Sequence, residues 1–409
     1  MLSFLTLFAV LQAQDRFPKP DFESGYQYPD IQYYIPNEIL WTAIDVVMLT
    51  ALMSLVAWVV IKKRTRKSII WVSIISVAYF GFFRNGCVCS IGSIQNVALS
   101  LFDDSYAMPL PVLLFFILPV IFAFLFGRVF CAGVCPFGAL QEFVNIRNYK
   151  LSKALSTVLG IIPWIYLIFA VVFAITQSRF IICRFDPFVG IFRLGGDVVL
   201  ITFGILLLIT AIFTGRPFCR FICPYGVLLG LFSRVSIWNI KLTKKTCINC
   251  ELCHNACPVD AIQPPYENKV KESRVQGVKR ILIYFALLPI LILSGALIMR
   301  HISENLSRVN KDVRLYDMIM LHESNPQNIL SADLEAFYTY GGTIEKIKQK
   351  YNDKQSEFKF CSTAAGALIG LFVGIALIGL SVKRTRKTYE IEHSNCVNCG
   401  RCFGYCPQN

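Results

Sequence analysis

Long apolar runs alternate with short basic or mixed segments along most of this chain of 409 residues. A helix needs about 20 mostly apolar residues to cross a bilayer, and seven runs reach or approach that length. They lie at residues 41–61, 69–83, 109–126, 157–176, 197–213, 279–299 and 362–382. The pattern predicts an all-α polytopic membrane protein with about seven transmembrane helices, and buried helices of a globular core are the weaker alternative.

The composition excludes an ordinary soluble enzyme and a disordered chain. Hydrophobic residues make up 55% of the chain and charged residues only 16%, too few to cover a water-facing surface. The net charge of +14 would suggest nucleic acid in a soluble protein. Here the basic residues lie beside the apolar runs, so we expect contact with membrane lipid and no nucleic-acid partner.

The basic flanks also predict an orientation. The sequence Lys-Arg-Thr-Arg-Lys follows the first run at 63–67 and the seventh run at 383–387. Basic flanks stay cytoplasmic, so seven crossings place the N-terminus outside and both tracts inside. We therefore expect a multi-pass protein of the bacterial cytoplasmic (inner) membrane.

The chain divides into alternating membrane and aqueous parts. Residues 1–14 are apolar and end in Leu-Gln-Ala-Gln, for which a cleaved signal peptide and an uncleaved anchor are the alternatives. The expected parts that follow are an exported arm (15–40), a membrane domain (41–240), a first cysteine motif (241–278), a transmembrane helix (279–299), an exported loop (300–360), a second transmembrane helix (361–382) and a second cysteine motif (383–409).

The membrane domain contains an internal repeat. Residues 130–138 match 218–226 as Phe-Cys-x3-Cys-Pro-[Phe/Tyr]-Gly, and Gly-Arg precedes each copy at the same offset of 88 residues. Short apolar stretches at 91–102 and 188–194 are candidates for re-entrant half-helices. Two helix pairs that run in the same direction imply a pseudo-two-fold axis along the membrane normal.

Two complete ferredoxin-type motifs follow the pattern Cys-x2-Cys-x2-Cys-x3-Cys-Pro. In two-cluster ferredoxins the fourth cysteine of each motif binds the other cluster. We therefore expect one [4Fe–4S] cluster on Cys247, Cys250, Cys253 and Cys406, and a second on Cys396, Cys399, Cys402 and Cys257. Zinc sites rarely use this run, and disulfides are rare on a cytoplasmic face.

The two motifs are expected to form one small cytoplasmic domain from split segments. Two crossings separate them, which returns the chain to the same side of the membrane. Inside the first motif, His254 is either a solvated loop residue or a side chain that tunes the cluster potential.

The other eight cysteines are candidate ligands of intramembrane sites. Cys131, Cys135, Cys219 and Cys223 occupy the repeat, and Pro136 and Pro224 are expected to begin new helices there. These four suit a symmetric cluster or metal site; small residues for helix packing, or plain reduced thiols, are the alternatives. The topology places Cys87, Cys89, Cys183 and Cys361 near the outer side, as a further redox site or as a disulfide with Cys361 left over.

The paired Cys-x3-Cys-Pro motifs, joined to two ferredoxin motifs, resemble the NapH/NosR-type polyferredoxin membrane proteins. The resemblance extends from residue 69 to the C-terminus. It implies electron transfer between a quinol or cytoplasmic donor and exported reductase systems. The exported arm is too short for the flavin-binding domain of NosR-type members, so the natural expectation is a separate flavoprotein or cytochrome partner.

Three functions remain open at this point. The first is an electron-transfer subunit of a membrane oxidoreductase complex, without catalytic residues of its own. The second is a quinol dehydrogenase, with Arg84, Arg128, Arg179 or Arg216 near a quinone head group. The third is an accessory protein that loads copper or another soft metal onto an exported metalloenzyme.

Overall fold

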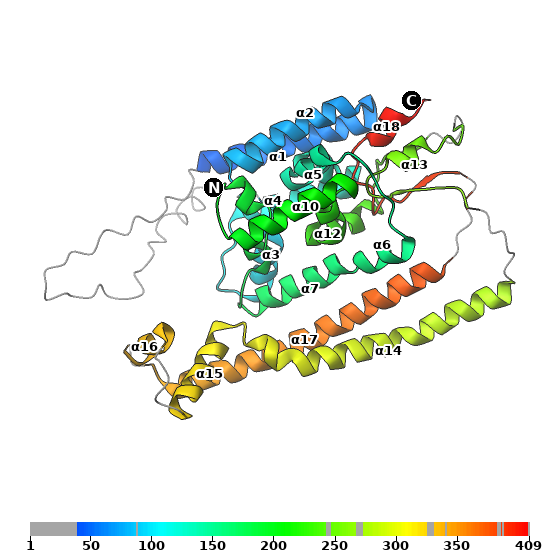
Figure 1. The fold of residues 1–409 in the computed structure, drawn as a ribbon. Helices are drawn as coiled ribbons and strands as arrows, with labels where there is room; N and C mark the ends of the chain where they lie inside the picture. The colour runs from blue at the N-terminus through cyan, green and yellow to red at the C-terminus, as the bar shows by residue number, and fades with distance from the viewer. Residues whose placement is uncertain are drawn as a thin grey trace, which may run out of the picture. The chain divides into compact units, whose positions relative to one another are not determined.

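The computed structural model describes residues 39–86, 89–242, 247–266, 273–324, 331–339, 342–382, 386 and 388–407. The predicted signal peptide, nearly all of the exported arm and Cys87 lie outside the described residues. The chain divides into two units, Met1–Thr42 and Ala43–Asn409. The second unit contains all the described cysteines and is mostly helical (Figure 1).

Helices occupy all seven predicted apolar runs. In the first half these elements are α1 (Ile39–Trp58), π-helix η2 (Val59–Lys63), α2 (Arg66–Ser76), π-helix η3 (Val77–Phe83), α3 (Ser93–Phe102), α4 (Leu110–Phe126), π-helix η4 (Phe130–Val134), α5 (Pro136–Val144), α6 (Lys153–Leu159) and α7 (Ile162–Ile175). The later ones are α8 (Ile181–Arg184), α9 (Val189–Phe192), α10 (Val198–Phe213), α11 (Pro217–Phe221), α12 (Pro224–Ser233), α13 (Leu252–Ala256), α14 (Arg274–Ser307), α15 (Lys311–Ser324), α16 (Ala332–Thr339), α17 (Ile344–Ser381) and α18 (Arg401–Tyr405).

Five helical stretches among the described residues are long and apolar enough to cross a membrane. They are Leu40–Lys63, Arg66–Phe83, Lys153–Ile175, Val275–Ser307 and Ile344–Ser381. The helices in the other two predicted runs, α4 and α10, have 17 and 16 residues and are shorter. The protein is therefore an α-helical membrane protein.

The two copies of the repeat pack against each other crosswise. Helix α4 of the first copy contacts α12 of the second, and α10 of the second contacts α5 of the first. In each copy a long apolar helix leads through a tight turn into the Cys-x3-Cys-Pro segment. The crossed packing places the two cysteine pairs on facing sides of one interior.

The last two long helices form a tightly packed hairpin, in which α17 and α14 run side by side (Figure 1). Gly366 and Gly370 of α17 lie against the backbone oxygens of Gly295 and Leu291 of α14, with no room for a side chain between them. Small residues let membrane helices approach this closely. The hairpin contacts α7, where the rings of Trp164 and Phe372 stack with centroids 4.0 Å apart.

Much of the segment 300–360, which the sequence predicts to be an exported loop, is helical. Helix α14 continues to Ser307, and α17 begins at Ile344, so both extend well beyond the predicted apolar runs. The residues just after 299 include no glycine or proline, and nothing local ends the helix there. The apolar run marks the membrane part of such a helix, and the helix itself is longer.

The two ferredoxin-type segments join through a short sheet. Strand β1 (Ile262–Gln263) pairs antiparallel with β2 (Glu390–Ile391), and helix α13 contacts α18. Segments separated in sequence by the α14–α17 hairpin therefore assemble side by side.

Candidate metal centres

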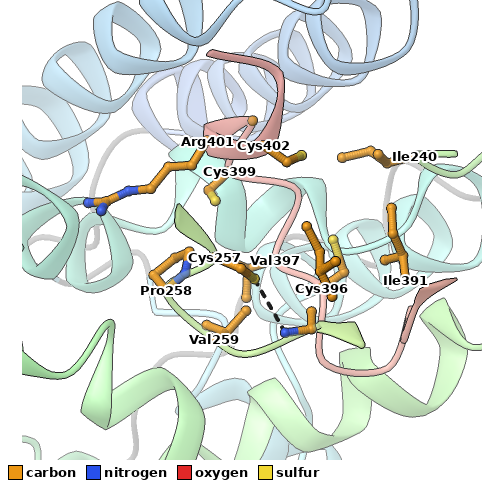
Figure 2. A pocket seen from close by; sticks show the side chains of 13 residues that line it. Ile240, Cys257, Pro258, Val259, Ile391, Cys396, Val397, Cys399, Arg401 and Cys402 are labelled. Atoms are coloured by element: carbon orange, nitrogen blue, oxygen red, sulfur yellow. Dashed lines mark hydrogen bonds between the residues drawn. The ribbon is translucent and has the colours of Figure 1, made fainter. Parts of the chain in front are cut away.

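Four cysteines from the two motif segments surround one cavity (Figure 2). We call Cys257, Cys396, Cys399 and Cys402 the packed set. Val259, Ile391 and Val397 make much of the remaining wall of this cavity apolar. The backbone N–H of Ala261 donates a hydrogen bond to the Cys257 sulfur at 3.3 Å. A cavity walled by four thiols and apolar side chains offers the ligand set of an iron–sulfur cluster.

The thiols of the packed set lie close enough for their charges to interact. Burial, followed by the neighbouring Cys399 and Cys396, raises the pKa of the Cys402 thiol well above its usual value. Buried thiols with raised pKa values keep their protons until a cation balances the thiolate charge. The irons of a cluster would supply that charge, so the donor set fits the group.

A second set of four cysteines lies beside the first and faces solvent. We call Cys247, Cys250, Cys253 and Cys406 the exposed set; three are exposed and Cys253 is partly buried. Cys253 interacts electrostatically with the other three, and Cys402 of the packed set interacts with Cys253. Each set thus combines the first three cysteines of one motif with the fourth cysteine of the other.

The two motif loops share one backbone conformation. Asn249 and Asn398 have φ values of 55° and 53°, and the residues two positions later, Glu251 and Gly400, have 62° and 71°. Two left-handed residues so close together curl the chain into a tight loop. Such a loop can present three cysteines to one side, as ligation of a cubane requires.

His254 is partly buried rather than fully solvated. Its Nδ1 donates a hydrogen bond to the backbone oxygen of Ile262 at 2.6 Å, which ties α13 to β1. Its ring centroid lies 6.3 Å from that of Tyr389. The hydrogen bond gives His254 a structural role within the cysteine-motif domain.

The structure brings the four cysteines of the repeat together inside the bundle. Cys135 interacts electrostatically with Cys219, Cys131 and Cys223. Three of these repeat cysteines are buried, and Cys219 is partly buried. Cys135 and Cys223 are the N-cap residues of α5 and α12, whose first residues are Pro136 and Pro224, as the sequence predicted.

Polar groups surround the sulfurs of the repeat cysteines. The Gly226 N–H donates to the Cys223 sulfur at 3.2 Å, and Gln141 Nε2 donates to the Cys219 sulfur at 3.6 Å. Arg128 Nη2 lies 3.8 Å from the Cys131 sulfur. Donors aimed at sulfur stabilise thiolate, the form that binds metals.

The remaining cysteines do not all converge. Gly92 separates Cys89 from Cys183: a methyl group at position 92 would lie 2.9 Å from the Cys183 sulfur and 3.9 Å from the Cys89 sulfur. Cys361 lies on α17 and packs against a small apolar cluster that includes Ile168. Cys89 and Cys183 thus both lie beside Gly92, whereas Cys361 packs in a different apolar cluster.

Within the described residues, no group of three or more His, Cys, Asp or Glu side chains converges closely enough to hold a single metal ion. A single ion such as zinc binds thiolates at about 2.3 Å and draws them tightly together. A cubane spreads its four ligands over four irons. The four thiols of each set match the ligand type and number of a cubane.

Salt bridges of Glu142 connect the second motif segment to the membrane helices. Its carboxylate accepts from Arg401 of α18 at 2.5 Å and from Arg216 at 3.0 Å, and it pairs with Arg66 of α2 at 3.3 Å. Glu142 is 8% exposed and Arg216 is fully buried. Although burial alone would raise it, the pKa of Glu142 is lowered by Arg216 and Arg401, so this carboxyl stays ionised.

The sequence reasoning missed this three-arginine contact. A signal was present, because Glu142 is the only acidic residue between positions 105 and 185. An isolated acid in such an apolar stretch rarely remains without a partner. Which arginines it meets depends on tertiary structure, since they come from three separate elements.

Comparison with known proteins agrees with these features. A family model described as a 4Fe-4S binding domain matches residues 108–154 and 197–243, the two copies of the repeat, and a second model of the same description matches 240–263. The uncharacterized protein MJ0750 of Methanocaldococcus jannaschii is 30% identical over 190 residues, which cover 44% of this chain and 77% of MJ0750. The regulatory protein NosR of Stutzerimonas stutzeri is 30% identical over 47% of this chain and 29% of NosR.

This chain belongs to the NosR/NapH-type family of 4Fe–4S ferredoxin membrane proteins. Protein NirI of Paracoccus denitrificans is also similar, at 28% identity over 46% of this chain and 30% of NirI. The matched region spans less than a third of NosR and of NirI. As a member of the NosR/NapH-type family, the protein is a membrane iron–sulfur protein. No solved structure matches the chain.

Proposed function

We propose that the protein passes electrons between a cytoplasmic or quinol donor and an exported or membrane partner. Two [4Fe–4S] clusters and the intramembrane cysteine sites would form the path. We regard the protein as an electron-transfer subunit of a membrane oxidoreductase complex and assign it no catalytic residues. The observation that carries this proposal is that the cysteine sets range from an exposed one to one inside the helix bundle.

Neighbouring sets interact electrostatically, either directly or with the same ionisable side chain. Cys402 of the packed set interacts with Cys253 of the exposed set. Arg216 interacts with Cys399 of the packed set and with Cys219 of the repeat. Tyr166 then interacts with Cys223 of the repeat and with Cys183 beyond it. Each set therefore has the next one nearby.

When bound, [4Fe–4S] clusters supply one-electron chemistry. The surrounding residues would control the access of a donor protein and of water. The exposed set lies where a donor protein can approach. The apolar walls of the packed set, such as Val259 and Val397, exclude water. The repeat cysteines and the Cys89–Cys183 pair are our candidate ligands for a further cluster or metal, and the separate position of Cys361 makes it the weakest candidate.

The orientation follows from the basic flanks and extends this proposal. All seven apolar helices would cross the membrane, with α4 and α10 near the lower limit of length. The N-terminus would be exported, and the ferredoxin motifs would face the cytoplasm of a bacterial inner membrane. Candidate partners are a flavoprotein, a cytochrome or quinone, together with membrane lipid.

The alternative function is metal loading, in which the repeat cysteines carry copper to an exported metalloenzyme. The chemistry of the four repeat thiols supports it, because thiolates are soft ligands that select Cu(I). The succession of sets favours electron transfer, since a metal carrier has no need of ferredoxin motifs next to its cargo site.

Anaerobic purification with iron, sulfide and copper analysis tests the proposal against this alternative. We expect at least eight irons per chain and paramagnetic resonance signals that a low-potential donor or a quinol generates reversibly. Cluster signals that respond to quinol alone would favour a quinol dehydrogenase. Copper bound in place of iron at the repeat cysteines would favour metal loading, and iron-free protein would overturn the proposal.

A further inference from the structure

The dipeptides Gly127-Arg128 and Gly215-Arg216 occupy matching positions in the two copies of the repeat. Both glycines lie where the cysteine-motif domain touches the membrane helices. A methyl group on Gly127 would lie 2.9 Å from Asn398 Nδ2, between the packed cysteines Cys396 and Cys399. Gly215 contacts Pro258, the residue after Cys257, with no room for a side chain. Each glycine thus contacts a different one of the two loops that carry the packed set.

The side chain of each arginine contacts the other copy of the repeat. A methyl group on Gly226 would lie 3.0 Å from Arg128 Nη2, and one on Gly138 would lie 3.4 Å from Arg216 Nη1. Gly138 and Gly226 are themselves matching positions near the starts of α5 and α12. The crossed contacts therefore follow the pseudo-two-fold symmetry of the repeat.

Both guanidinium groups lie between two cysteine sets. Arg128 Nη2 lies 3.8 Å from the Cys131 sulfur of the repeat. The guanidinium group also interacts electrostatically with Cys396 of the packed set and with Cys219 and Cys223 of the repeat. Arg216 interacts likewise with Cys399 and Cys219. Two buried cations thus occupy the junction between the packed set and the repeat cysteines.

The two cations differ in how their charge is balanced. Arg216 pairs with Glu142 at 3.0 Å. Arg128 is 6% exposed and has no carboxylate partner in the part of the chain that the structure describes. Its Nη1 donates to the backbone oxygen of Ser394 at 3.2 Å, and its Nε has no hydrogen-bond partner. An unbalanced buried cation is costly unless an anion lies nearby.

We infer that Arg128 is a positioning residue that raises the reduction potential of the cluster held by the packed set. This inference rests on the proposed function, because it assumes that the packed set holds a cluster. Four thiolates give a cluster net negative charge, and an added electron increases it. A cation in a low-dielectric site therefore stabilises the reduced form more than the oxidised form. Arg216 contributes less, since Glu142 offsets its charge.

The test is a redox titration, followed by paramagnetic resonance, of the full chain purified anaerobically. We expect Arg128→Gln to make reduction of the packed-set cluster at least tenfold less favourable, which lowers its potential by about 59 mV for one electron. The cluster on the exposed set should keep its potential. Arg128→Lys, which retains the charge, should give a smaller change. Arg234→Gln is the matched control, because Arg234 is an exposed residue at the end of α12 and should alter neither potential.

If the Arg128 variants do not assemble their clusters, Gly226→Ala tests the same inference. Gly226→Ala displaces the Arg128 guanidinium without removing its charge and should lower the same potential. Unchanged potentials in Arg128→Gln, or in Gly226→Ala if the Arg128 variants do not assemble, would overturn the role of Arg128. Absence of cluster signals from the wild-type protein would instead refute the proposed function.

Discussion

Replacing Glu142 with glutamine should loosen the second motif segment from the membrane helices. The change keeps the shape of the side chain and removes the charge that holds Arg401, Arg216 and Arg66. Arg216 is fully buried and would keep its charge without a carboxylate. Removing one partner of a buried ion pair typically costs about 3–5 kcal/mol.

A cost of about 3 kcal/mol corresponds to roughly a hundredfold larger population of the undocked segment, at about 1.4 kcal/mol for each factor of ten. Hydrogen–deuterium exchange of residues 388–407 measures this population, because amides in the segment exchange when it opens. We expect exchange to accelerate by about that factor. The readout requires no electron-transfer partner.

Glu390→Gln is the matched control in the same segment. Glu390 pairs with Arg386 at 4.0 Å and is 51% exposed, and exposed pairs contribute about 1 kcal/mol or less. In this variant the exchange rate of residues 388–407 should therefore change by less than about fivefold. If Glu142→Gln accelerates exchange no more than Glu390→Gln does, the three-arginine contact is not what holds the segment.

Three further predictions test other parts of the structure. Gly370→Leu should destabilise the α14–α17 hairpin by about 1–3 kcal/mol in thermal unfolding, because the α14 backbone contacts Gly370, whereas Gly379→Leu meets open space and should have little effect. Cys257→Ser and Cys247→Ser should abolish different paramagnetic signals, and loss of the same signal would refute the exchange of fourth cysteines between motifs. The pKa of Glu142 is lowered from its usual value of 4.5. The ionised carboxylate therefore stabilises the docked segment fully above about pH 4.5, and this stabilisation is lost as the pH falls further. Exchange of 388–407, corrected for intrinsic rates, should match at pH 7 and 5.5 and rise only below about pH 4.5.

Much of the architecture could be predicted because it depends on local patterns. Apolar runs set the positions of the helices, and proline after cysteine set the starts of α5 and α12. The exchange of Cys257 and Cys406 between motifs followed from the general chemistry of two-cluster ferredoxins. In the structure Cys257 lines one cavity with Cys396, Cys399 and Cys402, and the exchange of ligands itself stays a prediction.

Other features depend on contacts that no local pattern encodes. Glu142 meets arginines from three separate elements, and their convergence is a tertiary property. Predicted depth in the membrane alone groups Cys361 with Cys87, Cys89 and Cys183. Depth does not fix lateral position, and α17 holds Cys361 against a different apolar cluster.

The most direct test of the central claim is electron passage across a membrane. Proteoliposomes with entrapped ferricyanide would receive a reduced low-potential donor outside, and bleaching of ferricyanide would report transfer. We expect the wild-type protein and the Cys361→Ser control to bleach it, and Cys135→Ser to fail while keeping both ferredoxin-type clusters. Bleaching by Cys135→Ser at the wild-type rate would contradict a path through the repeat cysteines.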